Sequence, residues 1–106
     1  MYGLILIRYR LPMEEVAKVT DEHRSYLRDL KADGTLIASG PMDPRSGGAL
    51  LVRVPDDNVQ QNLTDLRDED PFYKKGVANY ELIPWKVIIG NEEDQTILRP
   101  FDLSLP

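Results

Sequence analysis

The chain has 106 residues, of which 42% are hydrophobic and 29% charged, and its net charge is −5. This length suits one domain with a thin core. The acidic balance argues against a nucleic-acid-binding surface, because such surfaces are rich in Lys and Arg. No apolar run reaches the ~20 residues that span a bilayer, and the N-terminal segment lacks the leading positive charge of a signal peptide. The sequence therefore predicts a cytoplasmic protein that binds neither nucleic acid nor membranes.

The residue types that are missing restrict the chemistry. The chain has no cysteine, and His23 is its single histidine. Disulfides, thiolate nucleophiles and Cys-ligated metals are thereby excluded, and one chain cannot build a multi-histidine metal site. No loop has EF-hand spacing, and Gly47-Gly48 belongs to no nucleotide-binding motif. We therefore expect no cofactor and no metal, although a site built from carboxylates alone stays open.

In the first half of the chain, a strand is followed by a helix and a hairpin. Residues 4–9 form an apolar run typical of a central strand, and Pro12 ends it. From residue 13 to residue 33 apolar side chains recur at three- and four-residue steps, which predicts a helix that Gly34 stops. Residues 35–39 and 49–54 are two short strands, joined by a loop rich in turn residues at positions 42–48.

The second half repeats the order of helix and strand. Residues 55–58 carry the capping and first-turn residues of a second helix, whose apolar stripe is Val59, Leu63 and Leu66 and which Pro71 ends. The last strand lies within residues 76–89, with Pro84 at a sheet edge or a bulge. Residues 90–106 lose all periodicity and are interpreted as an extended tail. The predicted domain therefore covers residues 1–89.

The resulting order, βαββαβ, is typical of the ferredoxin-like α+β fold. In this fold two helices cover one face of a four-stranded antiparallel sheet. The run from Leu4 to Ile7 is apolar at every position, so its side chains cannot all point toward the helices. A second copy covering the open face is the simplest remedy. We therefore expect a homodimer packed sheet to sheet, a dimeric α/β barrel.

One ionisable residue falls on the apolar stripe of each predicted helix. The stripe of the first helix includes position 23, a histidine, and that of the second continues to position 70, an aspartate. Both helices share one face of the sheet, so His23 and Asp70 can meet in a pocket. An Asp that accepts from one imidazole nitrogen leaves the other nitrogen as a general base. A structural histidine and a turn-forming aspartate are the competing interpretation.

Other polar groups are weaker candidates. Ser39 and Gly40 close the second strand, where a hydroxyl or backbone N–H group can bind a ligand or cap the turn. Tyr26 lies on the stripe of the first helix, either lining the pocket or belonging to the core.

Five segments together resemble the YciI-like family: residues 21–27 around His23, residues 34–41, residues 48–52, the Asp70-Pro71-Phe72 element and residues 80–86. Their order and spacing cover about residues 1–89. The resemblance implies a dimeric ferredoxin-like fold, with an active site that maps onto His23 and Asp70, with Ser39 beside it. Phe72 enters the expected substrate-binding set through the same element. One characterised member type is a dehydrochlorinase of a chlorinated hydroxyhydroquinone, but no residue here reports a chlorinated substrate.

These observations favour a cofactor-independent lyase or isomerase that acts on a small cyclic phenolic, enol or lactone compound. In this hypothesis His23 is the base, Asp70 orients it, and Ser39 or the backbone near Gly40 binds the developing oxyanion. The alternative is a non-catalytic dimeric module that binds a small molecule or assists a partner protein.

Overall fold

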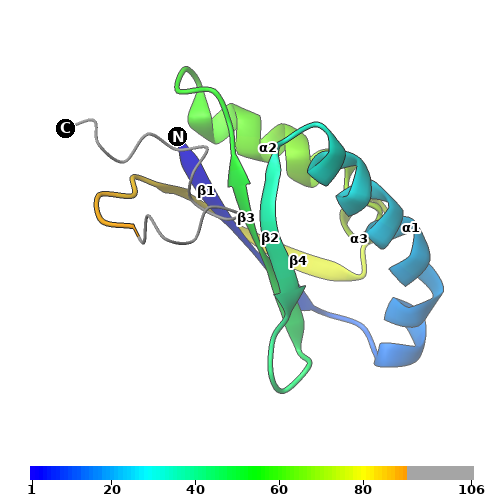
Figure 1. The fold of residues 1–106 in the computed structure, drawn as a ribbon. Coiled ribbons are helices and arrows are strands. Elements are labelled where there is room, and N and C mark those ends of the chain that lie inside the picture. The colour runs from blue at the N-terminus through cyan, green and yellow to red at the C-terminus, as the bar shows by residue number, and fades with distance from the viewer. Residues whose placement is uncertain (91–106) are drawn as a thin grey trace.

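The computed structural model describes residues 1–90. Their elements, in chain order, are β1 (Tyr2–Tyr9), α1 (Met13–Ala32), β2 (Leu36–Pro41), β3 (Gly47–Arg53), α2 (Val59–Glu69), α3 (Pro71–Lys74) and β4 (Ala78–Trp85). The four strands form one antiparallel sheet in the order β2-β3-β1-β4, and the helices lie on one of its faces (Figure 1). The predicted ferredoxin-like fold is confirmed. Apart from Gly90, the predicted tail lies outside the described residues.

The hairpin between β2 and β3 is longer than the turn residues predict. Gly40 pairs with Ala49 and Pro41 with Gly48, so β2 continues to the start of the expected loop and β3 begins inside it, at Gly47. Two residues without a β-carbon make this pairing possible. A β-carbon on Gly47 would overlap the backbone carbonyl of Ile7, and one on Gly48 would lie 3.0 Å from the carbonyl oxygen of Gly40. The Gly47-Gly48 pair therefore serves close strand packing at this end of the sheet.

Prolines mark the boundaries of the later elements. Pro71 follows the end of α2, as predicted, but it also begins the short helix α3, because its fixed φ suits the first helical turn. Pro84 lies in β4, which is an edge strand, so the missing N–H costs the sheet little. The predicted edge position of this proline is confirmed.

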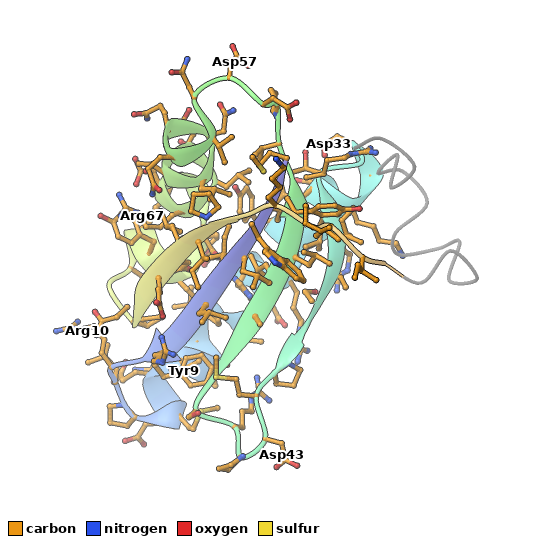
Figure 2. All side chains as sticks on the ribbon, turned by 90° about the vertical axis from the view of Figure 1, so that its left-hand side faces the viewer. Tyr9, Arg10, Asp33, Asp43, Asp57 and Arg67 are labelled. Atoms are coloured by element: carbon orange, nitrogen blue, oxygen red, sulfur yellow. The ribbon has the colours of Figure 1, made fainter. Side chains whose placement is uncertain are left out.

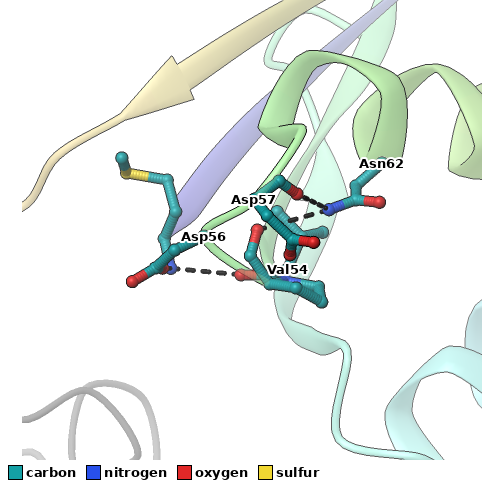
Figure 3. A network of polar contacts seen from close by, with 6 residues as sticks. Val54, Asp56, Asp57 and Asn62 are labelled. Carbon is teal, nitrogen blue, oxygen red and sulfur yellow. Dashed lines mark hydrogen bonds and ion pairs between the residues drawn. The ribbon is translucent and has the colours of Figure 1, made fainter.

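The start of α2 differs from the prediction. Asn58 adopts a left-handed conformation with φ of 57° and makes no side-chain cap. Asp56 instead accepts a hydrogen bond of 2.6 Å from the N-terminal amine of Met1 (Figure 3). The amide of Asn62 reaches back from α2 to the carbonyl oxygens of Pro55 and Asp57. Asp56 therefore fixes the residue that precedes β1, while Asn62 joins the loop to α2.

The core lies between the sheet and the helices. In β1, Ile5 and Ile7 point toward the helices, where Val16 of α1 and Leu63 of α2 are fully buried. The intervening residues Leu4 and Leu6 point to the other face by the alternation of a strand. Figure 2 shows this face of the sheet, with the helices behind it. None of the helices in the described part of the chain is long and apolar enough to cross a membrane.

Candidate active site

Helix α1 carries His23 into the interior. The buried positions of this helix are Val16, Val19, His23 and Leu30, which share one face at helical spacing. The predicted inward direction of His23 is therefore correct, and only 8% of the residue is exposed. A polar ring at this depth needs a hydrogen-bond partner.

Asp70 supplies that partner from the junction between α2 and α3. The sequence places Asp70 on the stripe of the second helix, but α2 ends at Glu69, and Asp70 is the extended residue between the two helices. Its carboxylate caps α3 by accepting a hydrogen bond of 3.0 Å from the backbone N–H of Phe72. Asp70 is thus both the turn-forming aspartate of the structural interpretation and a buried residue, 1% exposed, that faces His23.

The two side chains form a short contact. His23 Nδ1 lies 2.7 Å from Asp70 Oδ1, the same oxygen that caps α3. Because an ionised carboxylate can only accept, the proton of the pair belongs to Nδ1. In the neutral imidazole Nε2 then carries the lone pair, and no described residue hydrogen-bonds to it. Nε2 is the ring atom left to exchange a proton with a ligand.

Aromatic packing fixes the plane of the imidazole. The Phe72 ring stacks on His23 with a centroid separation of 3.9 Å and an interplanar angle of 9°. Tyr9 of β1 in turn contacts Phe72 edge to face at 5.9 Å. Asp70 therefore fixes the imidazole through a hydrogen bond at a ring nitrogen, and Phe72 fixes it by stacking on the ring face. Both contacts come from the Asp70-Pro71-Phe72 element.

A cavity of about 170 Å³ opens beside this ring, between α1 and the β2–β3 hairpin. His23, Phe72, Ser39 and Gly40 all contribute to its wall. Tyr26 does not line it; its hydroxyl donates to the backbone carbonyl of Leu66 at 2.8 Å and ties α1 to α2. The structure thus gathers five of the six sequence-predicted site residues, with Asp70 behind His23, and places Tyr26 elsewhere.

Two arginines in the cavity wall were not singled out from the sequence. Arg24 follows His23 on α1, and Arg45 comes from the loop between β2 and β3. Helical spacing places Arg24 at the edge of the buried stripe, next to His23. This position is the only feature of the sequence that indicated Arg24 as a residue of the site. Arg45 carries no such signal, because the path of a loop does not follow from its composition. In residues 1–90 no group of three or more His, Cys, Asp or Glu side chains is arranged to hold a metal ion.

Tyr80 lies close enough to Asp70 for the charge of the carboxylate to act on its hydroxyl. Asp70 Oδ2 and the Tyr80 hydroxyl are both buried without a hydrogen-bond partner among the described residues. Burial, and after it the nearby charge of Asp70, raises the pKa of Tyr80 far above its ordinary value. Burial, followed by the charges of Asp70, Glu69 and Asp33, likewise raises the pKa of Tyr26. Both phenols therefore stay neutral around the carboxylate.

These raised values predict a loss of stability at alkaline pH. Above pH ~10 the tyrosines of the unfolded chain ionise while Tyr80 and Tyr26 of the folded chain remain protonated. The unfolded state then binds fewer protons, so the free energy of unfolding falls as pH rises beyond that point. Urea unfolding at pH 8.5, 10 and 11 measures this fall, which we expect to be shallower in Tyr80→Phe. If the free energy of unfolding fell equally with pH in the wild type and in Tyr80→Phe, the raised pKa of Tyr80 would not be the cause of the fall.

The double role of Asp70 predicts a stability effect that separates it from its neighbours. Asp70→Ala removes the cap of α3 and leaves His23 Nδ1 buried without a partner, so we expect unfolding to become easier by about 2–3 kcal/mol. Asp70→Asn keeps an acceptor oxygen and should therefore lower the free energy of unfolding less than Asp70→Ala does. Asp68→Ala, at an exposed position two residues earlier, is the matched control. Chemical denaturation tests whether the loss of stability is largest in Asp70→Ala, smaller in Asp70→Asn and smallest in Asp68→Ala.

The fold and the site together define a class: a ferredoxin-like α+β protein with a buried His–carboxylate pair at the wall of a small cavity. The chain belongs to the family of the YCII-related domain, whose model matches residues 1–86. A search of curated proteins gives no significant match.

Among the solved structures that match is 5-chloro-2-hydroxyhydroquinone dehydrochlorinase (TftG) from Burkholderia phenoliruptrix AC1100, in complex with 2,5-dihydroxybenzoquinone. The two chains are 24% identical, and the match covers 81% of this chain and 94% of the dehydrochlorinase with a TM-score of 0.67. At this identity the likeness establishes a shared fold.

Proposed function

We propose that this protein is a cofactor-independent lyase or isomerase acting on a small cyclic phenolic or enol compound. The observation that carries the proposal is the 2.7 Å contact between His23 and Asp70 at the wall of the cavity. A buried His–carboxylate pair with one ring nitrogen left for a ligand is an arrangement that supports general-base catalysis.

In the proposed reaction His23 Nε2 takes a proton from a ring hydroxyl of the substrate. Asp70 accepts from Nδ1–H and stabilises the imidazolium that forms. The Ser39 hydroxyl, which lies in the cavity wall, donates to the oxyanion that develops as the proton leaves. General-base catalysis supplies about 10²- to 10⁴-fold, which suits a substrate already prone to tautomerise.

The likeness to a dehydrochlorinase supports a more specific form of this proposal. A chlorinated hydroxyhydroquinone would be deprotonated at oxygen and protonated at the carbon that bears chlorine. Loss of a second hydroxyl proton then forms the other carbonyl, and chloride leaves with the electron pair of the C–Cl bond. The net change is loss of HCl with formation of a hydroxyquinone, so no oxidant is needed. Such a step belongs to the degradation of chlorinated aromatic compounds, and we expect it to occur in the cytoplasm.

Turnover of 5-chloro-2-hydroxyhydroquinone by the purified protein tests the specific form. The expected result is chloride release in step with the appearance of a quinone absorbance, at a rate that increases with protein concentration. Unchlorinated hydroxyhydroquinone, followed for tautomerisation by NMR, tests the general form. Binding of either compound without any rate above the protein-free control would favour the non-catalytic module instead.

The uncovered sheet face supports a proposed homodimer. Leu4 of β1 lies directly opposite Leu51 of β3 and Ile83 of β4, and these half-buried side chains form an apolar row across the sheet. Trp85, 42% exposed, contacts Tyr2 at the end of the same face. A stable dimer buries ~800 Å² on each partner, and a second copy of this face is the occupant we propose.

The dimer predicts a change in mass when one charge enters this face. Sedimentation of the wild type at micromolar concentration should give twice the chain mass, and Leu6→Lys should shift the protein to monomer, because the partner would bury the ammonium group. Met13→Lys, at an exposed position where α1 begins, is the control and should leave the mass unchanged. A wild type that sediments as a monomer would show that something else covers the sheet.

A further inference from the structure

A second depression adjoins the cavity where α1 packs against β2. It measures about 230 Å³ and is more open than the first, and it lies between α1 and β2. Arg24, Leu27 and Ser39 line both hollows, so the two form one continuous surface. Arg28, Lys31 and Leu36 complete the wall of the second.

Three of these residues place positive charge along one line of the helix. Arg24, Arg28 and Lys31 follow one another at intervals of four and three residues, which aligns them on one face of α1. None of the three side chains forms an ion pair with another residue that the structure describes. Like charges at this spacing repel one another and weaken a helix. In a chain of net charge −5, this concentration of unpaired cations beside the cavity requires an explanation.

The two hollows also lack the opposite charge. Among residues 1–90 no Asp or Glu lines either of them, and Arg45, which has no ion-pair partner in this part of the chain, adds a further cation to the wall of the first. Arginine presents a planar fork that matches a carboxylate, and such charge-assisted bonds are stronger than neutral ones. Leu27 and Leu36 provide apolar surface beside the cations. This combination suits an anionic group joined to an apolar ring or short linker.

We propose that the ligand carries a carboxylate on a short arm: the ring occupies the cavity against His23, and the carboxylate binds the line formed by Arg24, Arg28 and Lys31. This proposal rests on the function proposed above for the placement of the ring. It narrows the substrate class from cyclic phenols in general to phenolic or enolic acids.

A matched pair of probes tests the carboxylate arm without requiring turnover. 2,5-Dihydroxyphenylacetate and its neutral amide share one ring and differ in the charge of the arm. In calorimetric or NMR titrations at low salt, the acid should bind at least tenfold more tightly than the amide. Its advantage should shrink as salt is raised, because exposed charges are screened. Equal affinities, or no binding of the acid at millimolar concentration, would overturn the proposal.

Two variants locate the effect. Arg28 and Lys31 line the second hollow and not the first, so Arg28→Gln and Lys31→Gln leave the wall beside His23 intact. Each should weaken binding of the acid by about threefold to tenfold and leave binding of the amide unchanged. Lys75→Gln removes the same charge from a residue that lines neither hollow and should affect neither probe. Circular dichroism of each variant verifies folding, and an effect of Lys75→Gln equal to that of Arg28→Gln would overturn the proposal.

The outcomes separate this proposal from the proposed function. If the protein binds the acid more tightly than the amide but turns over no phenolic compound, the proposed carboxylate site stands and the proposed lyase activity is wrong. If the protein turns over a neutral hydroxyhydroquinone but binds the acid and the amide equally well, the proposed lyase activity stands and the proposed carboxylate site is wrong.

Discussion

Replacement of His23 by glutamine is expected to lower kcat/KM for the hydroxyhydroquinone substrate by about 10²- to 10⁴-fold, the range that a general base supplies. The amide of the new side chain can still donate to Asp70, so the buried carboxylate is not left alone. What disappears is the lone pair of Nε2, which no amide replaces. Steady-state assays of chloride release and quinone formation measure the loss.

The control for this variant lies one residue away. Glu22→Gln changes an exposed side chain on the same helix and should retain the rate of the wild type. Thermal unfolding of both variants verifies that the helix remains folded. If His23→Gln and the wild type turned over the substrate equally fast, His23 would not be the base, and its contact with Asp70 would be structural.

Replacement of Gly47 by alanine is expected to cause the largest loss of stability among the glycine variants of the hairpin. The added β-carbon would overlap the carbonyl group of Ile7, and a backbone group in a central strand cannot rotate away as a side chain can. β3 would have to shift against β1. We expect a cost of about 2–4 kcal/mol, or a fall in Tm of roughly 10–20 °C.

Gly40→Ala provides the comparison for the same substitution on the neighbouring strand. A β-carbon on Gly40 would meet no atom within 4 Å, so the variant should unfold close to the wild-type temperature. Differential scanning calorimetry of the two proteins measures the contrast. A Gly47→Ala protein as stable as Gly40→Ala would mean that β3 moves freely at this end of the sheet.

The Gly47 prediction also illustrates what residue types alone leave open. From the sequence, Gly47-Gly48 belongs to a loop of turn residues. In the structure both glycines lie in β3 and pair with β1, and Gly48 also pairs with Pro41 of β2. Turn propensity is a local property, whereas strand extension depends on which backbone lies alongside. That neighbour comes from a segment about forty residues away and is not visible in the local pattern.

The order of helices and strands and the inward direction of His23 follow from the sequence, because the periods of helix and strand assign each side chain to a face before any neighbour is known. The approach of Asp70 depends on the turn between α2 and α3. Tyr26 lies on the predicted stripe but bonds to Leu66, and the cavity brings Arg24 together with Arg45. Periodicity assigns a residue to a face of its own element, but the partner it meets depends on how separate elements pack. The sequence therefore determines the fold class and the burial of His23. The contact between His23 and Asp70, and the arginines in the wall of the cavity, depend on the tertiary structure.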